Sequence, residues 1–322
     1  MLHTIGTPLN WAAFFVFVLV MLALDLFVFN RKSHEVKVRE ALAWSLVWIT
    51  LALVFNYLLY LEFGKQHALE FLTGYLIEKA LSVDNLFVFL VIFSYFAVPK
   101  RNQHRVLFWG ILGALIMRAI FIFLGAVLIQ KFSWIMYLFG AFLIFTGFKL
   151  LFQKGEEVHP EKNPVITLFK KMIPMVDHYK SDKFLLREHG KLFATPLLLV
   201  LVVVETTDVI FAVDSIPAIF AVTTDPFIVF TSNIFAILGL RALFFLLAGM
   251  MGRFHYLKYG LGLVLAFVGV KMVIVHWYKF PIGVSLGVIA SLLGLSIVVS
   301  LLKPVPSDQD LPRAPGDGTP IS

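Results

Sequence analysis

Residues 194–222 read ATPLLLVLVVVETTDVIFAVDSIPAIFAV, and this stretch decides the fold class. It is longer than the roughly 20 apolar residues that an α-helix needs to cross a bilayer. Apolar residues run almost unbroken through it, whereas the strand of a transmembrane barrel alternates apolar with polar residues. We therefore predict a membrane-spanning helix, and one that holds three carboxylates, Glu205, Asp208 and Asp214, inside the membrane.

The composition of the whole chain agrees with that reading. Of 322 residues, 60% are hydrophobic and 15% are charged, and the mean hydropathy is +0.89. These values exclude a soluble enzyme, a disordered chain and a coiled coil. The chain has no cysteine, which excludes disulfides, thiolate metal sites and thiol redox chemistry by its own residues. The net charge of +7 is better explained by membrane orientation than by nucleic acid, so the expected partner is the lipid bilayer.

We expect an all-α polytopic membrane protein with about nine transmembrane helices. The apolar runs that define them cover, within a few residues, 10–29, 40–61, 70–97, 105–129, 133–152, 194–222, 228–250, 256–277 and 282–302. A cytoplasmic loop with short interfacial helices is expected between the fifth and sixth helices, and a polar, proline-rich tail after the ninth.

The basic residues outside these helices predict the orientation. Alternate connections carry Arg31, Lys32, Lys37 and Arg39, then Lys100, Arg101 and Arg105, then eight Lys and Arg between 154 and 191, then Arg253 and Lys258. The opposite connections carry only Lys65, Lys131 and Lys279. Because basic loops stay in the cytoplasm, we expect an external N-terminus and a cytoplasmic C-terminus, in a bacterial inner membrane.

Three short stretches of the chain resemble three later stretches of the same chain. Glu78 to Asn85 matches Asp208 to Ser215, since each octet reads acid, five residues, acid, small polar residue. Arg118-Ala-x-Phe matches Arg241-Ala-x-Phe, and Gly147-x-Lys149 matches Gly269-x-Lys271. Helices three to five and six to eight are therefore predicted to be two copies of a three-helix unit. A unit with an odd number of helices inserts its second copy upside down, an arrangement typical of transporters.

This repeat gives the predicted domain organisation. The segments are two N-terminal helices, the first repeat, a cytoplasmic loop, the second repeat, a last helix and a disordered tail, over residues 1–69, 70–152, 153–193, 194–277, 278–303 and 304–322 respectively.

Charged residues inside the predicted helices indicate a function. An unpaired charge at the centre of a membrane helix costs roughly 2.5–3.5 kcal/mol on insertion scales, so an inert scaffold would not keep so many. We predict a metal-binding set of Glu78, Asp84, Asn85, Glu205, Asp208, Asp214 and Ser215. Supporting roles, such as holding acids in place, are expected for Asp25, Arg118, Arg241 and Lys271.

The predicted set offers only hard oxygen ligands, which suit Mg, Ca or Mn better than zinc or copper. Buried acids can also take up protons, so proton/cation antiport remains open. In an inverted copy, Glu78 is expected level with Asp214, and Asp84 level with Asp208. Six residues of helix separate these two levels by about 9 Å.

At these residues the sequence resembles the TerC family, most closely its Alx branch of bacterial inner-membrane proteins. The similar stretches are FLTGYLIEKALSVDNLFVF at 71–89, residues 203–242 and AWSLVW at 43–48. The resemblance extends over about residues 10–300 and implies a multi-pass cation exporter, with manganese(II) efflux as the activity. It also implies that Glu78, Asp84, Asp208 and Asp214 line the ion site, beside Asn85 and Ser215.

Two function classes are therefore compared. The leading one is a secondary transporter that exports manganese(II) as its substrate, with no resident cofactor. The alternative is a non-transporting membrane component that affects redox balance or metal and tellurite resistance through protein partners. An enzyme is not expected, because the chain has no Ser/His pair, metal-binding His motif or Gly-rich phosphate loop.

Overall fold

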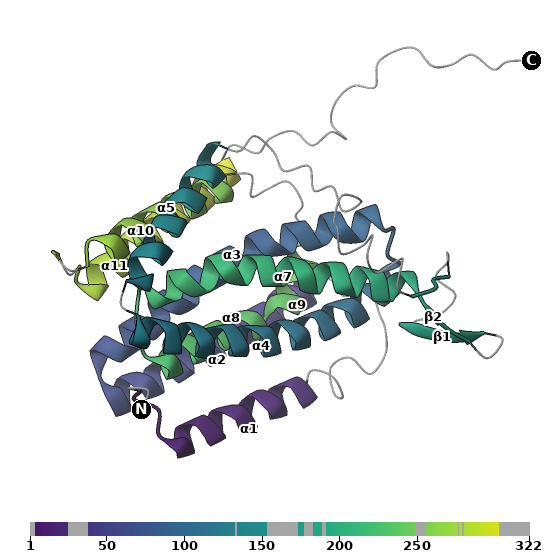
Figure 1. Cartoon of the computed structure of the whole chain (residues 1–322), viewed down its shortest axis with the longest axis horizontal. Helices are drawn as coiled ribbons and strands as arrows, with labels where there is room; N and C mark the ends of the chain where they lie inside the picture. Colours follow the sequence, from purple (N-terminus) through teal and green to yellow (C-terminus); the bar gives the residue numbers. More distant parts are fainter. Residues whose placement is uncertain are drawn as a thin grey trace, which may run out of the picture.

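The computed structural model describes residues 4–24, 38–132, 134–152, 173–176, 183–188, 191–248, 256–275, 277–278 and 280–302, except for the side chains of Leu24, Asp84, Phe87, Glu188 and Lys191. This part of the chain forms a helical bundle (Figure 1). Its helices are α1 (Pro8–Leu24), α2 (Val38–Phe63), α3 (Lys65–Tyr95), α4 (Lys100–Lys131), α5 (Ile135–Phe152), α7 (Pro196–Phe220), α8 (Pro226–Leu238), α9 (Leu240–Ala248), α10 (Leu257–Val273) and α11 (Ile282–Leu302).

The helices confirm the all-α class expected from the sequence. By length and composition α2, α4, α5, α7 and α11 can each cross a membrane, and the pair α8 and α9 makes a sixth candidate. The surface of the bundle carries large apolar side chains where a soluble protein would carry charges: Leu61, Phe145 and Leu295 are each more than 60% exposed. Such a surface is matched to lipid, not to water.

One predicted helix, 228–250, is broken. Its residues form α8 and α9, which bend by 41° at Gly239. Gly239 has no side chain, and a Cβ there would lie 3.0 Å from both the Lys79 ammonium and the Trp48 Cβ. Side chains of α2 and α3 therefore pack directly against the break, and only a glycine leaves them enough room. Apolar periodicity alone did not reveal this interruption.

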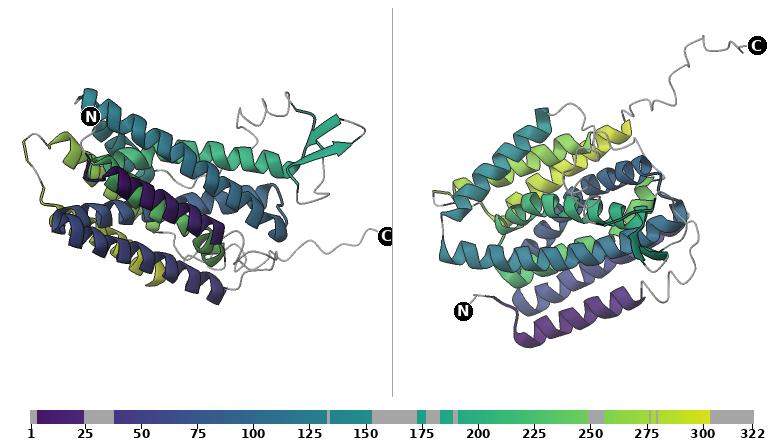
Figure 2. Two further views of the ribbon diagram at one scale, coloured as in Figure 1. Left: turned by 90° about the horizontal axis from the view of Figure 1, so that it is seen from below. Right: turned by 45° about the vertical axis from the view of Figure 1, so that its right-hand side comes forward.

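The helices are arranged in two groups. The central group contains α2, α3, α4, α7, α8 and α9, and α8 is buried along its whole length (Figure 1). Figure 2 shows α1 along one edge of the bundle and α5, α10 and α11 together on the opposite side. The two groups meet where α11 packs on α3 and α5 packs on α7.

Helices α5 and α10 pack through paired glycines. A Cβ on Gly140 would lie 3.0 Å from the Gly269 carbonyl oxygen, and a Cβ on Gly147 would lie 2.7 Å from the Gly262 carbonyl oxygen. The contacts are reciprocal. A Cβ on Gly269 would lie 2.7 Å from the Gly140 carbonyl oxygen, and a Cβ on Gly262 would lie 2.9 Å from the Gly147 carbonyl oxygen. The two backbones therefore cross antiparallel and in close contact, which only small residues permit.

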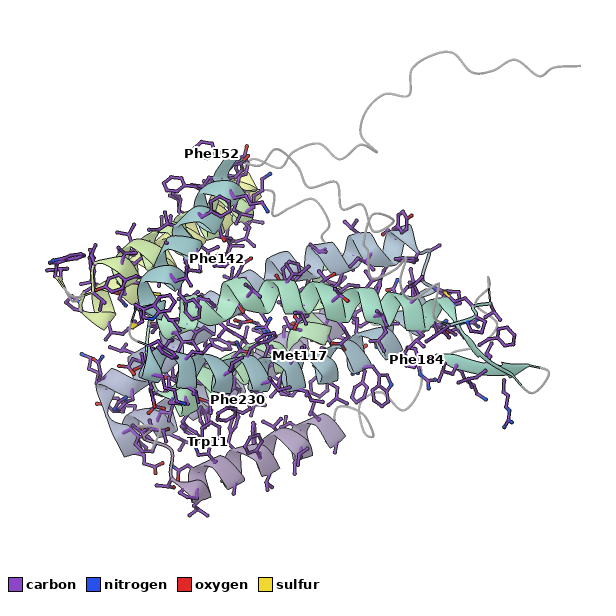
Figure 3. All side chains as sticks on the ribbon, in the orientation of Figure 1. Trp11, Met117, Phe142, Phe152, Phe184 and Phe230 are labelled. Carbon is purple, nitrogen blue, oxygen red and sulfur yellow. The ribbon has the colours of Figure 1, made fainter. Side chains whose placement is uncertain are left out.

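The N-terminal segment is attached to the start of α8. The Asp225 side chain caps α8 by accepting from the backbone N–H groups of Phe227 and Ile228. It also accepts from the backbone N–H of Ile5 at 2.6 Å and from the Thr4 hydroxyl at 3.1 Å. Beyond this contact, aromatic rings fill the seam between α1 and the bundle: Trp11 and Phe230, labelled in Figure 3, have centroids 5.5 Å apart.

Most of the segment expected to hold interfacial helices lies outside the described residues, and the described residues directly before α7 form a β-hairpin. Strand β1 (Leu185–Glu188) pairs antiparallel with β2 (Lys191–Ala194), directly before α7. Phe184, labelled in Figure 3, lies beside the hairpin and receives the Arg105 guanidinium of α4 at 5.3 Å from its ring centroid. This cation–π contact joins the hairpin to the start of α4.

Candidate ion site

The Arg118 guanidinium is the centre of a polar cluster inside the bundle. Arg118 lies on α4 and its side chain is completely buried. Its neighbour Met117 is labelled in the middle of the bundle in Figure 3. An arginine keeps its positive charge at any physiological pH, so a buried one requires negative partners.

Two acids supply that negative charge, one from α3 and one from α7. Arg118 Nη1 pairs with Glu78 Oε1, and Nη2 pairs with Asp208 Oδ1 at 3.3 Å. Glu78 is fully buried and Asp208 is 5% exposed. The side chain of Arg118 therefore joins two acids that lie at equivalent positions in the sequence repeat.

Two neutral side chains complete the contacts of Nη1. It donates to Ser215 Oγ at 3.3 Å and to Asn233 Oδ1 at 3.4 Å. Ser215 follows Asp208 by two turns on α7, whereas Asn233 comes from the buried helix α8. The cluster is thus built by four helices, α3, α4, α7 and α8.

Each acid keeps one oxygen free of protein partners. Among the described residues, Glu78 Oε2 and Asp208 Oδ2 are buried and accept no hydrogen bond. On Glu78, the Ser82 hydroxyl also reaches Oε1, at 3.5 Å, and leaves Oε2 unpaired. A buried carboxylate oxygen without a donor is costly unless a further group binds it.

Other residues of the predicted set lie elsewhere on the same helices. Asn85 is buried on α3, one residue after Asp84, whose side chain is outside the described part of the structure. Asp25 lies outside the described residues altogether.

Glu205, one turn before Asp208 on α7, faces α4. Its carboxylate occupies the place where a Cβ would stand on Gly113. Gly113 therefore makes room for a carboxylate, a purpose that its place in an apolar stretch did not reveal.

Asp214 makes a third, separate contact. Its Oδ1 accepts from the Thr146 hydroxyl of α5 at 3.3 Å, and Lys149 of α5 is close enough to act on it electrostatically. Lys271, on the last turn of α10, is close enough to Glu70 for their charges to interact. Arg241 is buried on α9 at the position equivalent to Arg118.

The structure thus brings Glu78, Asp208, Ser215 and Arg118 together. Glu205 lies one turn before Asp208 and also faces α4, whereas Asp214 contacts α5. Within the described residues, no three of His, Cys, Asp and Glu gather in the geometry of a metal site. The prediction of separate levels for Glu78 and Asp208 is wrong for their carboxylates, because both reach the same guanidinium. The long arginine side chain brings the two acids together, and helix rise alone could not reveal that.

Sequence reasoning missed Asn233 and assigned no role to Lys79. Asn233 ends the run Thr231-Ser232-Asn233, whose three side chains are fully buried in an otherwise apolar helix, and that polar run was the available signal. The Lys79 ammonium has a defined partner, the Ala236 carbonyl of α8 at 3.1 Å.

Comparison with known proteins agrees with this architecture. Residues 63–306 match the integral membrane protein TerC family. The chain belongs to the TerC family. It is an integral, multi-pass membrane protein, and the matched region contains every residue of the Arg118 cluster.

Proteins from several bacteria are similar to this chain over almost their whole length. An uncharacterized membrane protein of Myxococcus xanthus is 56% identical over 313 residues, covering 96% of this chain and 98% of its own. The "Putative membrane-bound redox modulator Alx" of Escherichia coli K12 is 52% identical over 308 residues, covering 93% and 96%. The protein of that name from Photorhabdus laumondii is 48% identical over 309 residues, covering 93% and 97%. No solved structure matches the chain.

Proposed function

We propose that this TerC protein is a secondary transporter, not an enzyme, and that it exports divalent manganese across the bacterial inner membrane. The observation that carries the proposal is the pair of buried acids, Glu78 and Asp208, that two different helices direct at one cation, the Arg118 guanidinium. A buried cluster of this kind can hold positive charge inside the bundle. Each acid also has an unpaired oxygen there, which a metal ion can use as a ligand.

The chemistry of the cluster favours a hard divalent cation. Its side chains offer carboxylate, amide and hydroxyl oxygens, which suit manganese, magnesium and calcium. Two carboxylates neutralise one divalent ion, whereas an anion would be repelled. The choice of manganese among these ions follows from the resemblance of the motifs to the family of cation exporters.

We further propose nine transmembrane spans that contain an inverted repeat. The remaining spans would be α1, α3 and α10. Support comes from the paired glycines of α5 and α10. In the sequence repeat Gly147 is equivalent to Gly269, and the same offset relates Gly140 to Gly262. Gly140 thus contacts the equivalent of Gly147, and Gly147 contacts the equivalent of Gly140, as a two-fold axis lying in the membrane plane would require.

The orientation remains that predicted from the basic loops, with the N-terminus outside and the C-terminus in the cytoplasm. In the proposed inverted repeat, Glu78 and Asp208 are equivalent residues that meet at one guanidinium. Equivalent residues meet only near the symmetry axis, so the proposed ion site lies close to the middle of the membrane.

The test is manganese tolerance and cellular manganese content in cells that lack their own exporter. Cells producing the wild-type chain should hold less manganese under excess manganese and survive it. Glu78→Gln and Asp208→Asn each remove one negative charge without changing shape, and each should abolish the protection. The matched control is Glu62→Gln, the same change on an exposed residue at the end of α2, which should protect fully. If cells producing the wild-type chain retained as much manganese as cells carrying the empty vector, export would be disproved.

A second candidate function rests on the names of the relatives. Several are named redox modulators, so the chain would act on redox balance through protein partners and carry no ion. With no cysteine of its own, the chain would do so without thiol chemistry. In that case the protein, purified and placed in vesicles of pure lipid, would move no manganese.

A further inference from the structure

We propose that Arg118 is a tethered substitute for the transported ion: without metal its guanidinium fills the cation position between Glu78 and Asp208, and a bound metal ion displaces it. This inference rests on the proposed function and concerns the same site.

The geometry of the cluster is that of a filled cation site. Each terminal nitrogen of the guanidinium takes one carboxylate, Glu78 on α3 and Asp208 on α7. The side chains of Arg118 and Glu78 are fully buried and that of Asp208 is only 7% exposed, so water screens these charges little. The guanidinium is held by the two helices that would also have to hold a metal ion.

Counting charges shows that the guanidinium and a divalent ion exclude each other. Two carboxylates with Arg118 leave a net charge of −1, and two carboxylates with a divalent ion leave zero. All of them together leave +1 and place two cations side by side at low dielectric, the most costly arrangement of the three. Binding of the metal must therefore move Arg118 away.

The cluster provides both an approach for the metal and a place for the displaced guanidinium. Within the described residues, Glu78 Oε2 and Asp208 Oδ2 take no hydrogen bond, so an arriving ion finds free lone pairs before Arg118 leaves. Ser215 Oγ and Asn233 Oδ1, at 3.3 and 3.4 Å from Nη1, are neutral acceptors. They can keep the guanidinium hydrogen-bonded without competing with a metal ion for charge.

This exchange has a consequence for transport. An empty carrier with two bare carboxylates in the membrane core would be trapped, because uncompensated charge does not cross readily. With Arg118 in the site the empty carrier can reorient, so net export needs neither a second metal ion nor a proton. Without the guanidinium, the carrier should cycle only when loaded, and export should become metal-for-metal exchange.

The experiment uses the full-length protein purified into lipid vesicles, with radiolabelled Mn²⁺ as the probe and with valinomycin and K⁺ to clamp the membrane potential. One arm measures exchange, in which vesicles loaded with unlabelled Mn²⁺ take up the label. The other measures net release of label into metal-free buffer. Wild type should do both. Arg118→Gln should keep exchange within about twofold and lose net release by about tenfold or more, whereas Arg118→Lys, which keeps the charge, should retain both.

The outcomes separate this inference from the proposed function. A wild-type protein that moves no label in either arm refutes the proposed function. Arg118→Gln that loses both activities equally while monodisperse, or keeps both, overturns the tethered-cation proposal alone. If Arg118→Gln does not fold, the wild-type protein provides the test. Its net release of manganese should persist after a protonophore collapses the pH gradient. If release stops, protons and not Arg118 allow the empty carrier to reorient.

Discussion

Lys79 donates a hydrogen bond from its ammonium to the Ala236 carbonyl oxygen over 3.1 Å, at the point where α8 ends. The last carbonyls of a helix have no partner within the helix and carry the negative end of its dipole. A lysine from α3 supplies both the missing donor and the opposite charge. A charge that looked expensive in the sequence thus stabilises a helix break in the middle of the bundle.

Replacing Lys79 by Met should therefore destabilise the protein. The change leaves the Ala236 carbonyl without its donor at the broken end of α8, which costs about 1–3 kcal/mol for a buried polar group. Thermal unfolding of the detergent-purified protein, followed by size exclusion, would measure the loss. The control is Lys131→Met, the same change at an exposed residue on the last turn of α4. Equal melting temperatures for the two variants would mean that Lys79 does not hold the break.

A side chain on Gly269 should separate α5 from α10. Its Cβ would lie 2.7 Å from the Gly140 carbonyl oxygen and 2.8 Å from the Ile144 amide nitrogen, both of which are backbone atoms that cannot move aside. Gly269→Ala should therefore cost about 1–3 kcal/mol, as overpacking does in cores.

The matched control for Gly269→Ala is Gly294→Ala on α11, since nothing lies within 4 Å of a Cβ built there. Melting temperatures measured side by side test the difference. A Gly294 variant as unstable as the Gly269 variant would show that helix propensity, not contact, sets the cost.

Composition and apolar run length were enough to predict the all-α class and the candidate membrane helices α2, α4, α5, α7 and α11, because a lipid environment requires long apolar segments whatever their packing. The sequence repeat also located Arg118, Glu78 and Asp208. It could not show that one guanidinium holds both acids, because this depends on how a long side chain crosses between helices. The break at Gly239 was equally hidden, because the side chains that pack against it, Lys79 and Trp48, lie on other helices and far away in the chain.

The orientation inferred from the basic loops gives a prediction that is independent of transport. A reporter that fluoresces only in the cytoplasm should be bright when fused after Ser322 and dark when inserted near Thr224, between α7 and α8. These sites are expected on opposite sides of the membrane, since the basic connections and the tail share the cytoplasmic side. Equal brightness at both sites, with equal protein abundance, would mean that the predicted number of spans is wrong by one.

Gly113→Ala should change transport without unfolding the protein. The new Cβ takes the place of the Glu205 carboxylate. That carboxylate is the far end of a flexible side chain, so it should turn away instead of forcing α4 and α7 apart. Glu205 lies one turn from Asp208 on α7, and its displacement should lower manganese tolerance while the membrane abundance stays at the wild-type level. Growth in excess manganese and immunoblots of membranes measure the two quantities.

A double mutant decides whether the effect of Gly113→Ala runs through Glu205. If the glycine serves only to seat that carboxylate, then Gly113→Ala should have no further effect on manganese tolerance in a Glu205→Ala background, where the carboxylate is absent. The two changes would then be strongly non-additive, as expected for residues in direct contact. Additive losses would show that Gly113 acts on the packing of α4 against α7, and full tolerance of Glu205→Ala itself would remove Glu205 from the ion path.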